Sequence, residues 1–219
     1  MIALPYNLDF TLPVTVDSHK APWFDSPGGE VSRCPLEREA AEHGHVTSLV
    51  RYSPGARFPA HNHPRGEEIL VLEGVFSDES GDYGPGTYLR NPPGSRHAPF
   101  SESGCTLFVK LDQFQDGDAR PLAIDTRPWR CDPGLPVELP LHSFKGEYSA
   151  LVRLQQGASA CLPALEGQVE ALVLAGTLLD AKGRYGPGTW LRRPAWHASE
   201  LKVAGDTLLF IKRGHFPAP

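Results

Sequence analysis

GARFPAHNHPRGEEILVLEG, residues 55–74, is the stretch of this 219-residue chain that decides the fold. His61 and His63 lie two positions apart in it, and on an extended strand this spacing places both imidazoles on one face. Glu67 follows a turn-forming Pro-Arg-Gly and begins a hydrophobic run. The stretch therefore predicts short strands that carry three polar side chains of the metal-ligand type.

A second stretch, GTYLRNPPGSRH at residues 86–97, supplies a fourth candidate ligand. It has the pattern of a strand, a Pro-Pro-Gly turn and then a lone histidine, His97. Three neutral imidazoles and one carboxylate suit a divalent first-row metal, and a six-coordinate ion would keep two positions for water, substrate or dioxygen. We therefore expect one metal site, formed by His61, His63, Glu67 and His97.

The chain is an internal repeat. Residues 83–90 read YGPGTYLR, and residues 185–192 read YGPGTWLR, 102 positions later. The same offset relates further pairs: 49–51 with 151–153, Gly55 with Gly157, Gly74 with Gly176, and 108–110 with 210–212. The copies run from about residue 20 to 112 and from about 127 to 216, and the polar stretch between them, residues 113–128, is typical of a connection over the surface.

Both copies have the composition of short strands joined by tight turns. Glycine and proline number 22 each, so together they make up about a fifth of the chain. Their combined share in an average protein is roughly 12%. Runs rich in β-branched and aromatic residues alternate with turn residues, as at 67–76 and 105–111. Residues 36–44 have helical propensity, but their counterpart in the second copy has none, so we expect strand and loop there. The pattern predicts an all-β sandwich or barrel.

The second copy lacks most of the candidate ligands. Apolar residues stand where the first copy has two histidines and a glutamate: Pro163, Leu165 and Val169. Only His197 remains, opposite His97. One imidazole does not hold a catalytic metal, so we expect a degenerate half that braces the first or contributes surface. A polar pocket around His197 and Trp196 is the alternative.

The two motifs resemble the paired signatures of the cupin superfamily. Gly55, His61, His63, Glu67 and Gly74 fit every interval of that family's first motif. The second motif is matched at four positions: Gly86, Pro92, Gly94 and His97. The asparagine that ends the family's second motif is Ser101 here; it is not a ligand in the family. The resemblance implies two tandem cupin barrels (double-stranded β-helix, or jelly roll), with residues 1–117 as the metal-binding cupin and 118–219 as the degenerate one.

Glu68 competes with Glu67 for the carboxylate position, because the family tolerates a gap of four residues. In the second copy Val169 occupies the place of Glu67, and Glu170 occupies the place of Glu68. The position that became apolar where the site vanished is the inward one, since alternate residues of a strand face opposite sides. We therefore choose Glu67.

Beyond the motifs, the first copy is similar to the ChrR-type cupin domain, known as the metal-binding half of an anti-sigma factor. In that family the positions of His61, His63, Glu67 and His97 hold zinc. The anti-sigma factors also carry an N-terminal helical zinc domain that grips the sigma factor, whereas only about 20 irregular residues precede the first cupin here. Direct binding of a sigma factor by that route is therefore not expected.

The same cupin type is similar to non-heme iron dioxygenases that cleave diketones and hydroxyketones. Two functions follow: oxygen-dependent chemistry on a small carbonyl compound, or a non-catalytic zinc-binding stress sensor. The expected cofactor is one divalent metal, zinc or iron, with manganese or nickel also compatible. Three side chains flank the motifs and are candidates for binding an anionic oxygen, although solvated strand-edge positions are the better expectation for them: Arg57, Tyr88 and Arg96. An intact ligand set disfavours a sugar epimerase.

Charge and composition favour a small-molecule ligand. The net charge of −5 is spread without basic runs, which disfavours nucleic acid and anionic membranes as partners. The N-terminus lacks a signal-peptide pattern, so we expect a cytoplasmic protein with reduced thiols at its four cysteines, Cys34, Cys105, Cys131 and Cys161. Five histidines match no motif: His19, His43, His45, His142 and His215. Monomer and homodimer both stay open.

Overall fold

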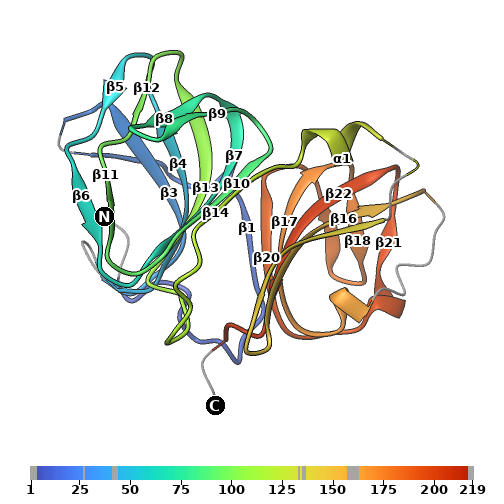
Figure 1. Cartoon of the computed structure of the whole chain (residues 1–219). Coiled ribbons are helices and arrows are strands. Elements are labelled where there is room, and N and C mark those ends of the chain that lie inside the picture. The colour runs from blue at the N-terminus through green and yellow to red at the C-terminus, as the bar shows by residue number, and fades with distance from the viewer. Residues whose placement is uncertain are drawn as a thin grey trace. The chain divides into compact units, whose positions relative to one another are not determined.

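The computed structural model describes residues 4–26, 28–40, 44–132, 134, 137–156 and 163–216. Nearly all regular structure in these ranges is strand, which confirms the all-β prediction; the described helices are α1 (Arg127–Cys131) and the 3₁₀ turns η1 (Pro163–Leu165) and η2 (Ala198–Glu200). The chain forms two compact units, Met1–Leu8 with Pro22–Asp132 and Asp9–Ala21 with Pro133–Pro219. Figure 1 shows each unit as a barrel of strands.

The first unit is built on a seven-stranded sheet. Its order is β14-β10-β7-β13-β4-β3-β2. The strands are β2 (Phe24–Asp25), β3 (Val31–Arg38), β4 (Val46–Tyr52), β7 (Glu67–Gly74), β10 (Thr87–Asn91), β13 (Cys105–Leu111) and β14 (Leu122–Asp125). Two smaller sheets complete the barrel: β5 (Ala56–Arg57), β12 (Phe100–Ser101), β8 (Phe76–Asp78) and β9 (Gly81–Tyr83), and the pair β11 (Ser95–His97) with β6 (His61–His63). Alternate residues of the large sheet, such as Ile69 and Val71, form the buried core.

The second unit repeats this plan. Its six-stranded sheet has the order β1-β20-β17-β22-β16-β15, and a three-stranded sheet has the order β19-β18-β21. The strands are β1 (Val14–Asp17), β15 (Glu138–Phe144), β16 (Glu147–Leu154), β17 (Gly167–Ala175), β18 (Leu178–Asp180), β19 (Gly183–Tyr185), β20 (Thr189–Trp196), β21 (Lys202–Val203) and β22 (Thr207–Arg213). The described part of residues 36–44 is the end of β3 followed by a bend, consistent with the expected strand and loop.

The edge strand of each large sheet comes from the segment that precedes the other copy. β1 pairs with β20 in the second unit, with Asp17 opposite Thr189, and in Figure 1 this blue strand lies beside the orange one. β14 pairs with β10 in the first unit, with Asp125 opposite Thr87. The stretch 113–128 is therefore not only a surface connection, and the division into units differs from the expected boundary after residue 117. The reason is that the strand LAID at 122–125 forms the edge of the large sheet in the first unit, just as the strand VTVD at 14–17 forms the edge of the large sheet in the second unit.

A glycine at the end of β7 allows a close approach of two strands. Gly74 has φ +70°, and a Cβ there would lie 2.0 Å from the carbonyl oxygen of Gly104. Gly176, its repeat counterpart, has φ +77°, and a Cβ there would lie 2.2 Å from the carbonyl oxygen of Asp206. Both the positive φ and the lack of space require glycine, which explains why the repeat keeps it. No helix among the described residues is long and apolar enough to cross a membrane.

Candidate metal centre

Three short strands bring the predicted ligands together. In the ladder between β6 and β11, His61 lies directly opposite His97. His63 follows two positions later on the same face, because side chains alternate along a strand. The chain then turns at Gly66, where φ is +83°, and Glu67 begins β7. Residues from two sequence motifs thus meet inside the first barrel.

The imidazoles converge on one small volume. Their ligand atoms, one each from His61, His63 and His97, all lie within 4.8 Å of one another. The Nε2 atoms of His63 and His97 are 3.0 Å apart. An oxygen of Glu67 lies 3.3 Å from Nε2 of His63 and 3.5 Å from Nε2 of His97. Three imidazole nitrogens therefore converge, and the carboxylate of Glu67 lies beside two of them.

Contacts on the far side of the rings set their orientation. Nδ1 of His61 lies 2.9 Å from the carbonyl oxygen of Pro59, so Nδ1 carries the proton that it donates. Nδ1 of His97 lies 3.4 Å from a carboxylate oxygen of Asp78. In both rings this leaves the lone pair of Nε2 directed into the site. The side-chain amide of Asn91 donates to Glu67 over 3.0 Å and holds that carboxylate in place.

The electrostatics of the cluster favour a cation. Burial, reinforced by the neighbouring His97, lowers the pKa of His63 to about 4. Burial raises the pKa of Glu67. For His97, burial lowers the pKa, but the hydrogen bond to Asp78 and the charge of Glu67 outweigh it and raise the pKa. The Nε2 atoms of His63 and His97 lie within hydrogen-bonding distance of each other at 3.0 Å, and a divalent cation would take the place of the proton between them, so this donor set fits a metal.

Glu67 and Glu68 serve different faces of β7. Glu68 accepts hydrogen bonds from the hydroxyl of Tyr88 over 3.0 Å and from Nη1 of Arg90 over 3.1 Å. The guanidinium of Arg90 also contacts Asp118 over 2.6 Å. Glu68 is thus part of a buried ion-pair network on the face opposite the histidines. Glu67 is the carboxylate that lies at the histidines.

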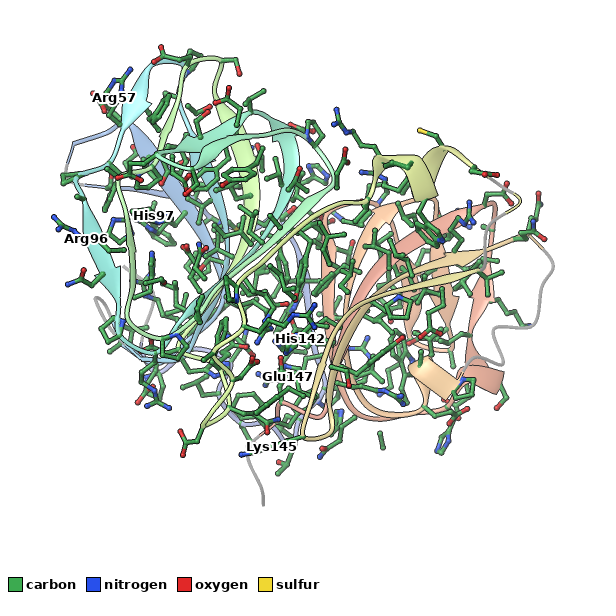
Figure 2. All side chains as sticks on the ribbon, viewed as in Figure 1. Arg57, Arg96, His97, His142, Lys145 and Glu147 are labelled. Carbon is green, nitrogen blue, oxygen red and sulfur yellow. The ribbon has the colours of Figure 1, made fainter. Side chains whose placement is uncertain are left out.

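The three residues considered for an anionic oxygen do not face the site. Arg57 is exposed and pairs with Glu102. Arg96 is exposed, and Figure 2 shows its side chain and that of Arg57 directed away from the first barrel, whereas His97 lies between the strands. Tyr88 is bonded to Glu68 on the opposite face. Both arginines have the solvent-exposed strand-edge positions that we expected for these residues, whereas Tyr88 is fully buried.

Two polar residues inside the barrel were missed by the motif analysis. Tyr52, at the end of β4, belongs to the buried core that surrounds the site. Arg33, on β3, lies with its guanidinium carbon 5.7 Å from the ring centre of Phe58, and that ring packs edge-on against His61. The repeat carried a signal for Tyr52, because 102 positions later the residue is Leu154.

The second barrel has an apolar interior where the first has ligands. Leu165 and Val169 are fully buried, and Trp196 is 2% exposed in the same core cluster. β20 continues to Trp196 without a Pro-Pro-Gly turn, so Trp196 points inward and the next residue outward. His197 has a side chain that is 65% exposed and lies 3.6 Å from Glu166. The alternative of a polar pocket around His197 and Trp196 is therefore wrong.

Three of the remaining histidines have polar partners in the structure. His19 contacts the carbonyl of Pro187, His45 pairs with Glu37, and His215 pairs with Glu170. His142 is buried. Cys34 and Cys105 are buried free thiols, and burial raises the pKa of Cys34 to about 11, while Cys131 is an exposed free thiol. His43 and Cys161 lie outside the described residues.

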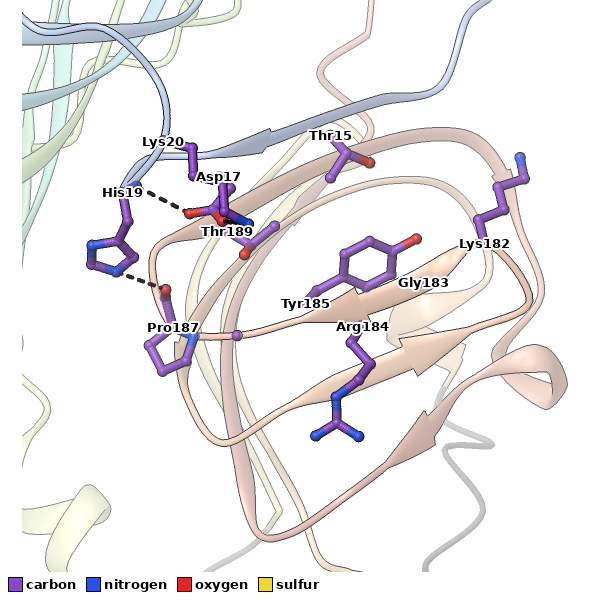
Figure 3. A pocket seen from close by; sticks show the side chains of 11 residues that line it. Thr15, Asp17, His19, Lys20, Lys182, Gly183, Arg184, Tyr185, Pro187 and Thr189 are labelled. Atoms are coloured by element: carbon purple, nitrogen blue, oxygen red, sulfur yellow. Dashed lines mark hydrogen bonds and ion pairs between the residues drawn. The ribbon is translucent and has the colours of Figure 1, made fainter.

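A pocket of about 530 Å³ opens on the second unit between β1 and the β18–β19 hairpin. Its charged lining includes Lys20, Lys182 and Arg184. Lys20 is already paired with Asp17 over 2.9 Å. In Figure 3 the side chains of Lys182 and Arg184 extend in different directions, so the cations do not converge on one ligand position.

Two jelly-roll barrels in tandem, one with a histidine-rich centre at its small strand pair, define the cupin class of protein. The chain belongs to the family described as the ChrR cupin-like domain, whose model matches residues 12–115 and again 122–217. Both the cupin prediction and the ChrR-type resemblance are thereby confirmed. A comparison with curated protein sequences gave no match.

Solved structures share the fold at low sequence identity. A putative dioxygenase from Nostoc punctiforme superposes with a TM-score of 0.69 at 15% identity, over 95% of this chain and 85% of that one. The pirin YhhW of Escherichia coli in complex with nickel(II) has a TM-score of 0.67 at 13% identity, over 92% and 98%. A salicylate 1,2-dioxygenase mutant from Pseudoaminobacter salicylatoxidans has a TM-score of 0.58 at 12% identity, over 94% and 85%. These likenesses concern the fold.

Proposed function

We propose that this chain is a metal-dependent enzyme whose first barrel binds one divalent metal through His61, His63, Glu67 and His97 and uses it for oxygen-dependent chemistry on a small carbonyl compound. The observation that supports this most is the convergence of three imidazoles, two of them with Nδ1 held by a protein acceptor, so that Nε2 is left as a donor. Four protein ligands leave coordination positions for a substrate.

The groups around the ligands hold them in position. Asp78 and the carbonyl of Pro59 fix the imidazole tautomers, and Asn91 holds Glu67. Phe58 packs against His61 over 5.1 Å between ring centres, and Phe76 packs against His97 over 6.0 Å, so both imidazoles have an aromatic neighbour. When bound, a redox-active metal such as iron supplies Lewis acidity toward a carbonyl oxygen and electron exchange with dioxygen.

Elemental analysis of the purified protein, followed by oxygen-uptake assays with pentane-2,4-dione and small hydroxyketones, tests this function. We expect about one iron, manganese or nickel per chain and metal-dependent oxygen uptake. His97→Ala should lose the metal, whereas His197→Ala should keep it because His197 is exposed in the other barrel. Retention of the metal by His97→Ala would contradict the site.

A zinc-binding sensor is the second candidate, supported by the match to the ChrR cupin-like family. It predicts one tightly held zinc and no oxygen uptake with any diketone or hydroxyketone, even after the zinc is exchanged for iron. That combination would replace the enzyme proposal while leaving the ligand set intact.

A further inference from the structure

Two polar side chains enter the first barrel from adjacent strands. Tyr52 on β4 lies directly opposite Val31 on β3, and both are buried in the barrel core. Arg33 follows Val31 by two positions, so it shares the inward face of β3. Its partner in the ladder is Val50, also a core residue. The register therefore places a guanidinium and a phenol on the inner wall of the barrel.

Aromatic contacts link both side chains to the metal centre. The guanidinium carbon of Arg33 lies 5.7 Å from the ring centre of Phe58, whose ring lies 5.1 Å from that of His61. On the other side, the ring of Tyr52 lies 6.1 Å from that of Phe76, which in turn packs against His97. Arg33 and Tyr52 are thus each separated from a histidine of the centre by one aromatic ring.

Neither side chain has a polar partner within the part of the chain that the structure describes. Tyr52 is 8% exposed, and its hydroxyl forms no hydrogen bond to a described residue. Arg33 forms no ion pair with a described residue, although it stacks on Phe58. Burial and the charge of Glu67 raise the pKa of Tyr52, so the phenol stays a hydrogen-bond donor at neutral pH. Because no described residue uses these donors, they are available to a ligand inside the barrel.

The degenerate barrel has lost both residues. Leu154 replaces Tyr52, and Glu138 replaces Arg33, because Glu138 lies opposite Val152 as Arg33 lies opposite Val50. Glu138 there accepts a hydrogen bond from Tyr148 within its own unit. The guanidinium and the phenol are thus absent from the barrel that also lacks the metal ligands.

We propose that Arg33 and Tyr52 bind the carboxylate of a small 2-oxo acid while its carbonyl oxygen faces the metal ligands. The proposal rests on the metal site of the proposed function and names its substrate class. A guanidinium donates two parallel hydrogen bonds to a carboxylate, and the phenol supplies a third donor. One cationic side chain matches the single charge of a carboxylate better than the double charge of a phosphate monoester.

Binding of pyruvate and of butane-2,3-dione to the cobalt(II)-loaded protein, followed anaerobically by the visible spectrum, tests this inference. The two compounds have similar shape, but only pyruvate is charged. We expect Arg33→Gln to weaken pyruvate binding about tenfold or more, as the loss of a hydrogen bond to a charged group predicts, with little change for the dione. Tyr52→Phe should weaken pyruvate binding by a smaller factor, and Arg33→Lys should restore part of the loss.

Arg96→Gln is the matched control, because Arg96 is exposed on the outer side of β11. The pyruvate affinity of this variant should equal that of the parent protein. If the parent protein does not bind cobalt, the proposed metal site fails. If cobalt binds and Arg33→Gln and Tyr52→Phe keep the parent affinity for pyruvate, the carboxylate site is overturned and the metal site stands. Should Arg33→Gln not fold, as judged by circular dichroism, Arg33→Lys and Tyr52→Phe decide the question.

Discussion

Asp78 holds His97 from behind, since one of its carboxylate oxygens lies 3.4 Å from Nδ1 of that imidazole. Because this contact keeps Nε2 as the donor, Asp78→Asn should lower the affinity for a divalent metal by about 10–100-fold without unfolding the protein. Competition with a chromogenic chelator measures the affinity. Asp82→Asn is the control, because Asp82 on β9 bonds to Ser77 and not to a histidine. Equal affinities in the two variants would refute the role of Asp78.

Substitutions of the neighbouring residues Glu67 and Glu68 should have opposite effects on metal binding and on stability. Glu67→Gln should weaken metal binding strongly and leave the fold intact, because Glu67 lies at the histidines. Glu68→Gln should keep the metal but reduce the free energy of unfolding by about 1–3 kcal/mol, because Arg90 loses a charged partner while fully buried. Denaturant unfolding and metal analysis of both variants separate the two effects. Loss of metal only in Glu68→Gln would exchange the two assignments.

Gly74 and Gly55 both have positive φ but differ in the space around them. Gly74→Ala should be the more destabilising change, because its Cβ would lie 2.0 Å from the carbonyl oxygen of Gly104. We expect a loss of at least about 2 kcal/mol, from backbone strain and from the forced separation of the strands. Gly55→Ala meets no atom within 4 Å, so only the strain of φ +81° remains, about 1 kcal/mol. Similar melting temperatures for the two variants would count against this account.

Acid should destabilise the metal-free protein through His63. Its pKa falls from the ordinary value of 6.5 to about 4 on folding, so between these values the unfolded chain binds more protons than the native one. The stabilising effect of neutral His63 is complete above pH 6.5 and is lost as the pH falls toward 4. His63→Asn should therefore lose less stability than the parent over this interval, measured by thermal unfolding after chelation. His197→Asn, at an exposed position, should follow the parent curve.

Motif spacing was sufficient to predict which residues meet at the centre. His61, His63, Glu67 and His97 come together because strand alternation and a short turn act locally, and those rules can be applied to letters alone. The choice of Glu67 over Glu68 also agrees with the structure, in which Glu67 lies beside the histidines and Glu68 lies on the opposite face. The second copy gave the signal, because only the position of Glu67 is apolar there. The all-β fold followed in the same way from turn residues and β-branched runs.

Contacts that depend on strand register, or on pairing between segments far apart in the chain, could not be predicted from the sequence. The inward position of Arg33 depends on how β3 pairs with β4, and that ladder shifts between Pro35 and Glu37. Asp78 meets His97 only because β8 joins β12 and thereby closes the barrel. His197 was aligned with His97 by sequence, but the absence of a turn in β20 reversed its direction. Such features depend on pairing between segments far apart in the chain.

The exchanged edge strands affect the order in which the chain becomes complete during its synthesis. Residues 14–17 leave the ribosome well before their partner, the strand Thr189–Trp196, is translated. The first barrel, by contrast, has all its strands once residue 125 has emerged. The first barrel can thus be complete while the nascent chain is still growing, whereas residues 14–17 find their partner only after residues 189–196 have been translated.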